Sequence, residues 1–131
     1  MKTVGIDTNA LLSFRLQREP TSNEVKKLFE QSLENKTKLY IPFPVILEVE
    51  WVLRSYYKQN KEAILPFFEE MLLLGNVLTD YKEEIKFALN LYRNSNKISF
   101  TDAIIVSIVK SKGYDFLTFD RDLEKTYQSL L

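Results

Sequence analysis

The chain has 131 residues, of which 45% are hydrophobic and 27% charged, a composition typical of one globular domain rather than of a disordered segment. It contains no cysteine and no histidine, which excludes disulfides, zinc–thiolate sites, thiol nucleophiles and Ser-His-Asp catalysis. Lysine plus arginine and aspartate plus glutamate each number 18, so the net charge is zero and a generally basic nucleic-acid coat is excluded, although a local basic patch is not.

Strands and helices alternate along the predicted chain. The predicted strands cover residues 2–6, 39–41, 77–79 and 115–119. The predicted helices begin after a cap at Thr8 or Asn9, after the break at Pro20, near 45, near 62, after a cap at Asp80, after a cap at Ser99, and near 122. This order predicts an α/β fold in three layers, α/β/α, with a central, mainly parallel sheet of four to five strands and a single domain spanning residues 1–131.

Two further features bear on location. The most apolar stretch, residues 103–109, is too short to cross a bilayer, so we expect no association with a membrane. Asp7 interrupts the apolar start too early for a signal peptide, so we expect a cytoplasmic protein.

Four acidic residues have no cation three or four residues away along the chain, although Arg121 directly follows one of them, Asp120. Asp7 follows the first predicted strand, and Asp120 follows the fourth, which are places where open parallel sheets form their sites. Glu48 has Pro44, Val45, Trp51 and Val52 at helical spacing, and Asp102 is likewise among apolar neighbours. Glu50, by contrast, has Arg54 four residues on, and we expect that pair to be solvated.

Each acid also has a structural explanation. Asp7 is a candidate helix cap, Asp120 a candidate turn residue, and Asp102 a candidate partner of the Ser99 cap. Together, however, four carboxylates in a chain without histidine or cysteine favour a site for Mg²⁺ or Mn²⁺. Such a site would activate water against a phosphodiester.

The contexts of these acids resemble those of PIN domains. The matching segments are Asp7-Thr8-Asn9, Pro44 to Arg54 around Glu48, Ser99 to Ile105 around Asp102, and Leu117 to Asp122 around Asp120. The resemblance covers the whole chain, and it implies a metal-dependent endoribonuclease similar to the VapC-like toxins of toxin–antitoxin pairs. It implies that Asp7 and Asp102 bind the metal directly, with Glu48 and Asp120 completing the acidic pocket.

The same resemblance assigns further roles. Asn9 and Thr118, and also Thr8, are expected to orient ligands or substrate, while Ser99 is expected to be only a cap. Glu48 is preferred to Glu50 because of Arg54, and Asp122 competes with Asp120. The family usually forms homodimers and is silenced by a small antitoxin protein. The apolar helix around Phe67 and Phe68 is expected to supply both core residues and a dimer or antitoxin surface.

RNA must reach an acidic pocket, so cations are expected at its rim. Lys97 and Arg121 are the preferred candidates, whereas Arg15 and Lys125 are expected rather to be solvated surface charges. Three other functions stay open on the sequence. They are a housekeeping RNA-processing nuclease without an antitoxin, a non-catalytic PIN scaffold that binds RNA or protein, and phosphoryl transfer through an aspartyl nucleophile. The last is disfavoured because Asp7-Thr8-Asn9 lacks a second acid two residues on.

Overall fold

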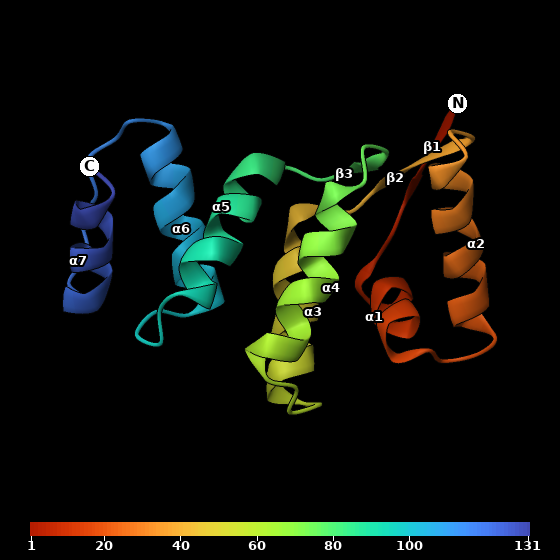
Figure 1. Cartoon of the computed structure of the whole chain (residues 1–131), viewed down its shortest axis with the longest axis horizontal. Coiled ribbons are helices and arrows are strands. Elements are labelled where there is room, and N and C mark those ends of the chain that lie inside the picture. The colour runs from red at the N-terminus through yellow and green to blue at the C-terminus, as the bar shows by residue number, and fades with distance from the viewer. The chain divides into compact units, whose positions relative to one another are not determined.

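The computed structural model describes all 131 residues, which form two compact units, residues 1–80 and 81–131. Each is described by itself (Figure 1). None of the helices is both long and apolar enough to cross a membrane.

The first unit contains a parallel sheet of three strands. These are β1 (Lys2–Gly5), β2 (Thr37–Tyr40) and β3 (Val77–Leu78), in the order β1-β2-β3. Val4 pairs with Leu39, and Leu39 pairs with Val77, so β2 is the central strand. Leu39 and Val77 are fully buried. The predicted α/β fold with a parallel sheet is confirmed, but the sheet has three strands rather than four or five.

Four helices connect these strands. They are α1 (Thr8–Leu16) and α2 (Thr21–Leu33) between β1 and β2, and α3 (Phe43–Ser55) and α4 (Lys61–Leu73) between β2 and β3. Helix α1 packs against α2 and α3, and α3 packs against α4. The unit's core contains fully buried side chains from several of these elements, among them Leu11, Ile46, Leu53, Phe68 and Leu72. Pro66 lies inside α4 on its exposed side and does not delay the start of the helix.

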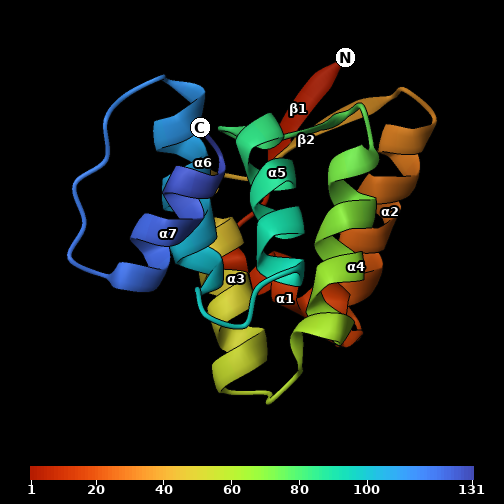
Figure 2. The ribbon, with the colours of Figure 1, turned by 60° about the vertical axis from the view of Figure 1, so that its left-hand side comes forward.

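The second unit contains helices only. They are α5 (Lys82–Arg93), α6 (Phe100–Ser111) and α7 (Arg121–Ser129), and α6 packs against both others (Figure 2). Ile85, Ala88 and Ala103 are fully buried, and the rings of Tyr92 and Phe100 lie 5.8 Å apart. The hydroxyl of Tyr127 on α7 donates to the carbonyl of Tyr114, which ties the preceding loop to the last helix.

The predicted fourth strand, residues 115–119, is wrong. This segment is an irregular connection between α6 and α7. A strand requires backbone hydrogen bonds to a neighbouring strand, and the second unit contains no other strand. As a result Leu117 and Phe119 are exposed, at 81% and 95%.

One predicted helix cap is also wrong. Asp80 does not cap α5, whose N-cap is Tyr81 in the left-handed conformation (φ 59°). The carboxylate of Asp80 instead accepts hydrogen bonds from the hydroxyl of Tyr40, at 2.7 Å, and from the backbone of Phe43, at 3.4 Å. It therefore joins the end of β3 to the end of β2 and the start of α3.

Candidate functional site

Asp7 stands at the carboxyl end of β1 and is the N-cap of α1. Its Oδ1 accepts a hydrogen bond from the backbone of Ala10 at 2.8 Å. The predicted caps Thr8 and Asn9 are instead the first helical residues. A cap uses one carboxylate oxygen, so the other oxygen of this exposed side chain has no protein partner. The structural role of Asp7 thus leaves it available to a ligand.

Asn9 lies two residues further on and lines an open cavity of about 350 Å³. The cavity is formed where α1 turns into α2, and its other lining residues are Ala10, Ser13, Arg18, Thr21, Glu24 and Val25. We call it the Asn9 cavity. Arg18 belongs to this cavity although no motif in the sequence marks it.

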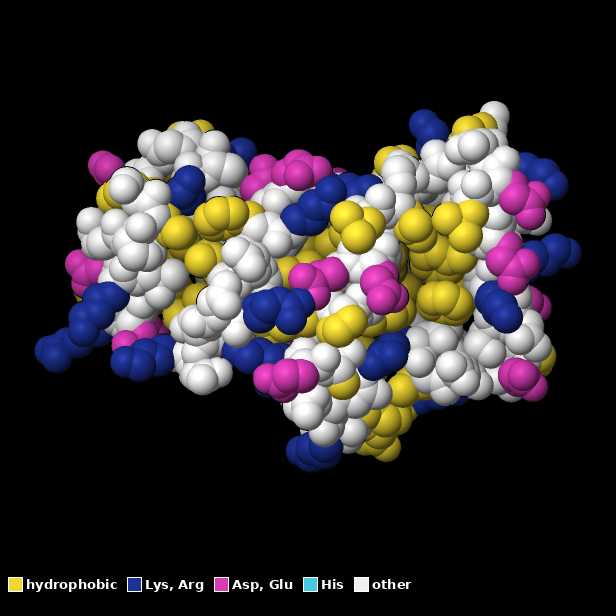
Figure 3. Space-filling model, in the orientation of Figure 1, with side chains coloured by type: hydrophobic (Ala, Val, Ile, Leu, Met, Phe, Trp, Pro, Cys, Tyr) yellow, Lys and Arg dark blue, Asp and Glu magenta, His cyan; other side chains and the backbone are white.

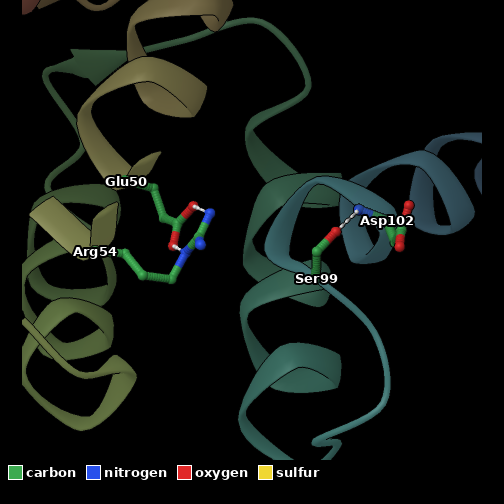
Figure 4. Close-up of polar contacts among 4 residues, drawn as sticks. All are labelled: Glu50, Arg54, Ser99 and Asp102. Atoms are coloured by element: carbon green, nitrogen blue, oxygen red, sulfur yellow. Dashed lines mark hydrogen bonds and ion pairs between the residues drawn. The ribbon is translucent and has the colours of Figure 1, made fainter. Parts of the chain in front are cut away.

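Helix α3 carries two acidic residues, and their burial is opposite to the expectation. Glu48 is exposed, although its helical neighbours include Val45 and Val52. Glu50 is only 2% exposed, and its carboxylate binds Arg54, with the Nε–Oε2 distance at 2.8 Å (Figure 4). The expectation that this ion pair is solvated is therefore wrong for Glu50.

The physical reason lies in the helix period. The side chains four residues before and three residues after Glu50 are Ile46 and Leu53, which are both fully buried. Glu50 is consequently carried into the core, where its charge needs Arg54 as a partner. The corresponding neighbours of Glu48, Pro44 and Trp51, are exposed. Glu48 is thus the acid on α3 that solvent and ligands can reach.

In the second unit, Asp102 lies in the first turn of α6. Ser99 is the N-cap of this helix, and its Oγ accepts a hydrogen bond from the backbone of Asp102 at 3.0 Å. The expectation that Ser99 is a cap is confirmed. The carboxylate of Asp102 extends away from Ser99 and has no hydrogen-bond or ion-pair partner (Figure 4). The pair is therefore not a reciprocal capping box.

Asp120 is the N-cap of α7. Its Oδ1 accepts a hydrogen bond from the backbone of Leu123 at 3.1 Å, and its own backbone donates to Oγ1 of Thr118 at 3.1 Å. Thr118 thus fixes the backbone that carries Asp120. Asp122 is half-buried in the first turn of α7, while Asp120 is exposed. The greater accessibility of Asp120 favours it over Asp122 as a ligand.

The predicted rim cations differ in their surroundings. Lys97, Arg121 and Lys125 are exposed. Arg15 is not the solvated charge that we expected, because its Nη2 donates to Oε1 of Gln59 at 3.1 Å and to the carbonyl of Ala63 at 3.0 Å. Its guanidinium also lies 5.4 Å from the ring centroid of Phe67. Arg15 therefore ties α1 to the start of α4.

The carboxylates fit a hard metal ion by their chemistry. Asp7 and Glu48 belong to the first unit and Asp102 and Asp120 to the second, and within neither unit do three such side chains come together as a metal-binding group. Each of the four keeps at least one oxygen without a protein partner, and none forms an ion pair. Oxygen donors alone, in a chain without histidine or cysteine, suit Mg²⁺ or Mn²⁺ better than zinc.

The chain is similar to known proteins over nearly its whole length. The family model for the PIN domain matches residues 4–128, which include all four acids and both units. A VapC ribonuclease of Aquifex aeolicus (strain VF5) is 27% identical over 121 residues, which are 92% of this chain and 89% of that protein. The match confirms the PIN-like α/β fold class that the sequence motifs predicted, and the chain belongs to the PIN domain family.

Proposed function

We propose that this protein is a metal-dependent endoribonuclease and the toxin of a toxin–antitoxin pair. Family membership and the similarity to a VapC ribonuclease along nearly the whole chain support this function. The observation that carries it is the state of the four acids. Asp7, Glu48, Asp102 and Asp120 all retain carboxylate oxygens that no protein group occupies. Accessible carboxylate oxygens without a protein partner are the ligands that a hard metal ion requires.

The residues have distinct proposed roles. Asp7 and Asp102 hold Mg²⁺ or Mn²⁺, and Glu48 and Asp120 complete the acidic pocket directly or through water. Helix N-termini favour the negative charge of these acids, because Asp7 and Asp120 accept hydrogen bonds from backbone N–H groups as N-caps and Asp102 lies in the first turn of α6. When bound, the metal ion supplies an activated water and offsets the charge of the phosphodiester.

Other residues support the site without binding the metal. Asn9 hydrogen-bonds to the RNA from the wall of its cavity, and Thr118 holds Asp120 in place. Arg121 and Lys97 are exposed and attract the phosphate backbone. Because the net charge is zero, only a few such contacts contribute to binding, and its salt dependence is correspondingly shallow.

Two surfaces suit protein partners. Phe14 and Phe67 line an open groove of about 510 Å³ whose other residues are mainly polar or charged, which suits an amphipathic segment of a small antitoxin. Hydrophobic side chains also gather at the surface between α2 and α4 (Figure 3). Leu33, the last residue of α2, and Leu73, the last residue of α4, are 64% and 75% exposed. We propose that Leu33 and Leu73 lie in the interface of a homodimer.

The decisive experiment is cleavage of a mixed pool of structured and single-stranded RNA with Mn²⁺, with Mg²⁺ and with EDTA. We expect metal-dependent cleavage that Asp7→Asn in the first unit and Asp102→Asn in the second each abolish. Cleavage that survives both substitutions would exclude the proposed site. Absence of both cleavage and Mn²⁺ binding in the wild type would instead favour the non-catalytic scaffold.

The antitoxin needs a separate test. Co-expression with the protein encoded by a neighbouring small reading frame should relieve growth arrest and yield a stable complex. A nuclease that is harmless on its own and has no such partner would be a housekeeping RNA-processing enzyme.

A further inference from the structure

The Asn9 cavity contains a cation that the sequence analysis missed. Arg18 lines the cavity and is exposed, and its guanidinium forms no ion pair. It lies over the ring of Tyr57, with 5.4 Å between Cζ and the ring centroid. A guanidinium placed over a ring keeps its N–H donors at its edge, so they remain available to an anion.

The backbone of Arg18 is held firmly. Its carbonyl accepts hydrogen bonds from Oγ of Ser13, at 3.2 Å, and from Oγ1 of Thr21, at 2.9 Å. Its N–H donates to the carbonyl of Ser13 at 2.9 Å, and the hydroxyls of Ser13 and Thr21 bond to each other. Ser13 is only 5% exposed, and Ser13 and Thr21 both line the cavity, so this network forms part of its wall. The chain therefore fixes the position of Arg18 before any ligand arrives.

Besides Arg18, the polar residues of the cavity wall are Asn9, Ser13, Thr21 and Glu24. Asn9 offers a donor and an acceptor, and Glu24 offers a carboxylate. A bare phosphate would suit Arg18 but not Glu24, whereas a ribose hydroxyl can donate to a carboxylate. A volume of about 350 Å³ is within the range of small-ligand sites. The cavity thus matches a unit that has an anionic end and a hydroxyl-bearing end.

We propose that the Asn9 cavity binds one ribose-phosphate unit of the RNA strand, with the phosphate at Arg18 and a ribose hydroxyl at Glu24. This inference rests on the proposed ribonuclease function and deepens it. Asn9 is two residues from Asp7, so the bound unit lies beside the proposed cleavage site. Contact with a ribose hydroxyl would make this cavity one source of a preference for RNA over DNA.

The test compares Arg18→Ala with Lys27→Ala, which removes an equal charge from an exposed position on α2 outside the cavity. Binding of a short, fluorescent single-stranded RNA is measured at several salt concentrations in the Asp102→Asn background, so that the probe stays intact. We expect Arg18→Ala to weaken binding about tenfold and to lower the salt slope by about 0.7, with Lys27→Ala within about twofold of the parent. Arg18→Lys should keep the salt slope but recover only part of the affinity, because it lacks the planar fork.

A second readout addresses the ribose. The same probe made as DNA gives the ratio of RNA affinity to DNA affinity, and Glu24→Gln should reduce this ratio. Thermal unfolding of each variant shows whether it is folded, which separates lost binding from lost structure.

Three outcomes would overturn the proposal. Equal effects of Arg18→Ala and Lys27→Ala on binding, while the wild type cleaves RNA, would show that the cavity is not a subsite although the function holds. A loss of antitoxin affinity in Arg18→Ala, with RNA binding intact, would assign the cavity to a protein partner. A wild type that neither binds nor cleaves RNA would remove the proposed function and this inference together.

Discussion

Glu50 and Arg54 lie one helical turn apart on α3 and form an ion pair of 2.8 Å whose two ends have very different surroundings. The side chain of Glu50 is 2% exposed, and that of Arg54 is 41% exposed. An acid is thus held in the core by a base at the surface. The two single substitutions should therefore cost different amounts of stability. Removal of Arg54 leaves the charge of Glu50 buried and unpaired, whereas removal of Glu50 leaves the charge of Arg54 in contact with solvent.

The first prediction concerns stability. We expect Arg54→Gln to lower the free energy of unfolding by about 3 kcal/mol, because it leaves the buried carboxylate of Glu50 without its pair. Glu50→Gln should cost roughly 1 kcal/mol, since the Arg54 side chain still reaches solvent. Urea unfolding of both variants gives the two values. Equal losses would contradict the asymmetry.

The second prediction separates the two acids of α3 by function. Glu48→Gln should reduce RNA cleavage between about 10- and 100-fold with little change in melting temperature, because Glu48 is exposed and supports the proposed metal site. Glu50→Gln should change cleavage only a few-fold but lower the melting temperature. Initial rates of RNA cleavage and melting temperatures are measured on the same two preparations, so that lost activity is separated from lost stability. The reverse pattern would place Glu50 in the site.

A third prediction exploits the double role of Asp7 as a cap and as a proposed metal ligand. Asparagine caps helices about as well as aspartate, so Asp7→Asn should keep the stability of the wild type while it abolishes metal-dependent cleavage. Asp7→Ala should also abolish cleavage, and it should lower the free energy of unfolding by about 1 kcal/mol. Denaturant unfolding without metal distinguishes the two variants. If Asp7→Asn keeps its activity, Asp7 is only a cap.

The fourth prediction follows from the contact between Tyr40 and Asp80. The hydrogen bond to Asp80 raises the pKa of the Tyr40 hydroxyl above its usual value, with smaller contributions from burial and from the negative charge of Asp80. A raised pKa in the folded state means that the stabilisation is complete below the pKa of the unfolded chain and is lost as the pH rises through the folded value. Tyr40→Phe should therefore melt at a lower temperature than the wild type at neutral pH, and the difference should shrink above about pH 10. A difference that is constant with pH would contradict this.

A fifth prediction concerns the surface between α2 and α4. Leu73→Lys should convert a homodimer into monomers, because the lysine charge would be buried in an apolar interface. Glu62→Lys, on the exposed part of α4, is the matched control and should leave the assembly unchanged. Sedimentation equilibrium gives the mass in each case. A wild type that is already monomeric would remove Leu73 from consideration as an interface residue.

Much of the molecule was predictable from local patterns. The start of α6 at the Ser99 cap was predicted correctly, because a cap followed by an apolar run is a local signal. The order and identity of the four acids were equally visible, and they carried the resemblance that the family match confirms. Such features depend on residues a few positions apart, which the sequence presents directly.

Other features depended on contacts between distant segments. Residues 115–119 have the apolar composition of a strand, but they form none, because strand formation requires hydrogen bonds to another strand. Asp80 was a reasonable helix cap by position, yet it binds Tyr40, forty residues away. No local sequence pattern predicts such a partner.

The sequence by itself determined which groups are available: carboxylates without histidine or cysteine, three of them at helix starts, so that any bound metal would have oxygen ligands. The tertiary structure decided which of these groups solvent can reach. It placed Glu50 in the core and Glu48 at the surface, and it gathered Arg18 with Asn9 in one cavity. Burial is decided by how whole elements pack, and a step of two residues along a helix is a rotation of about 200°, which carries the side chain to the opposite face.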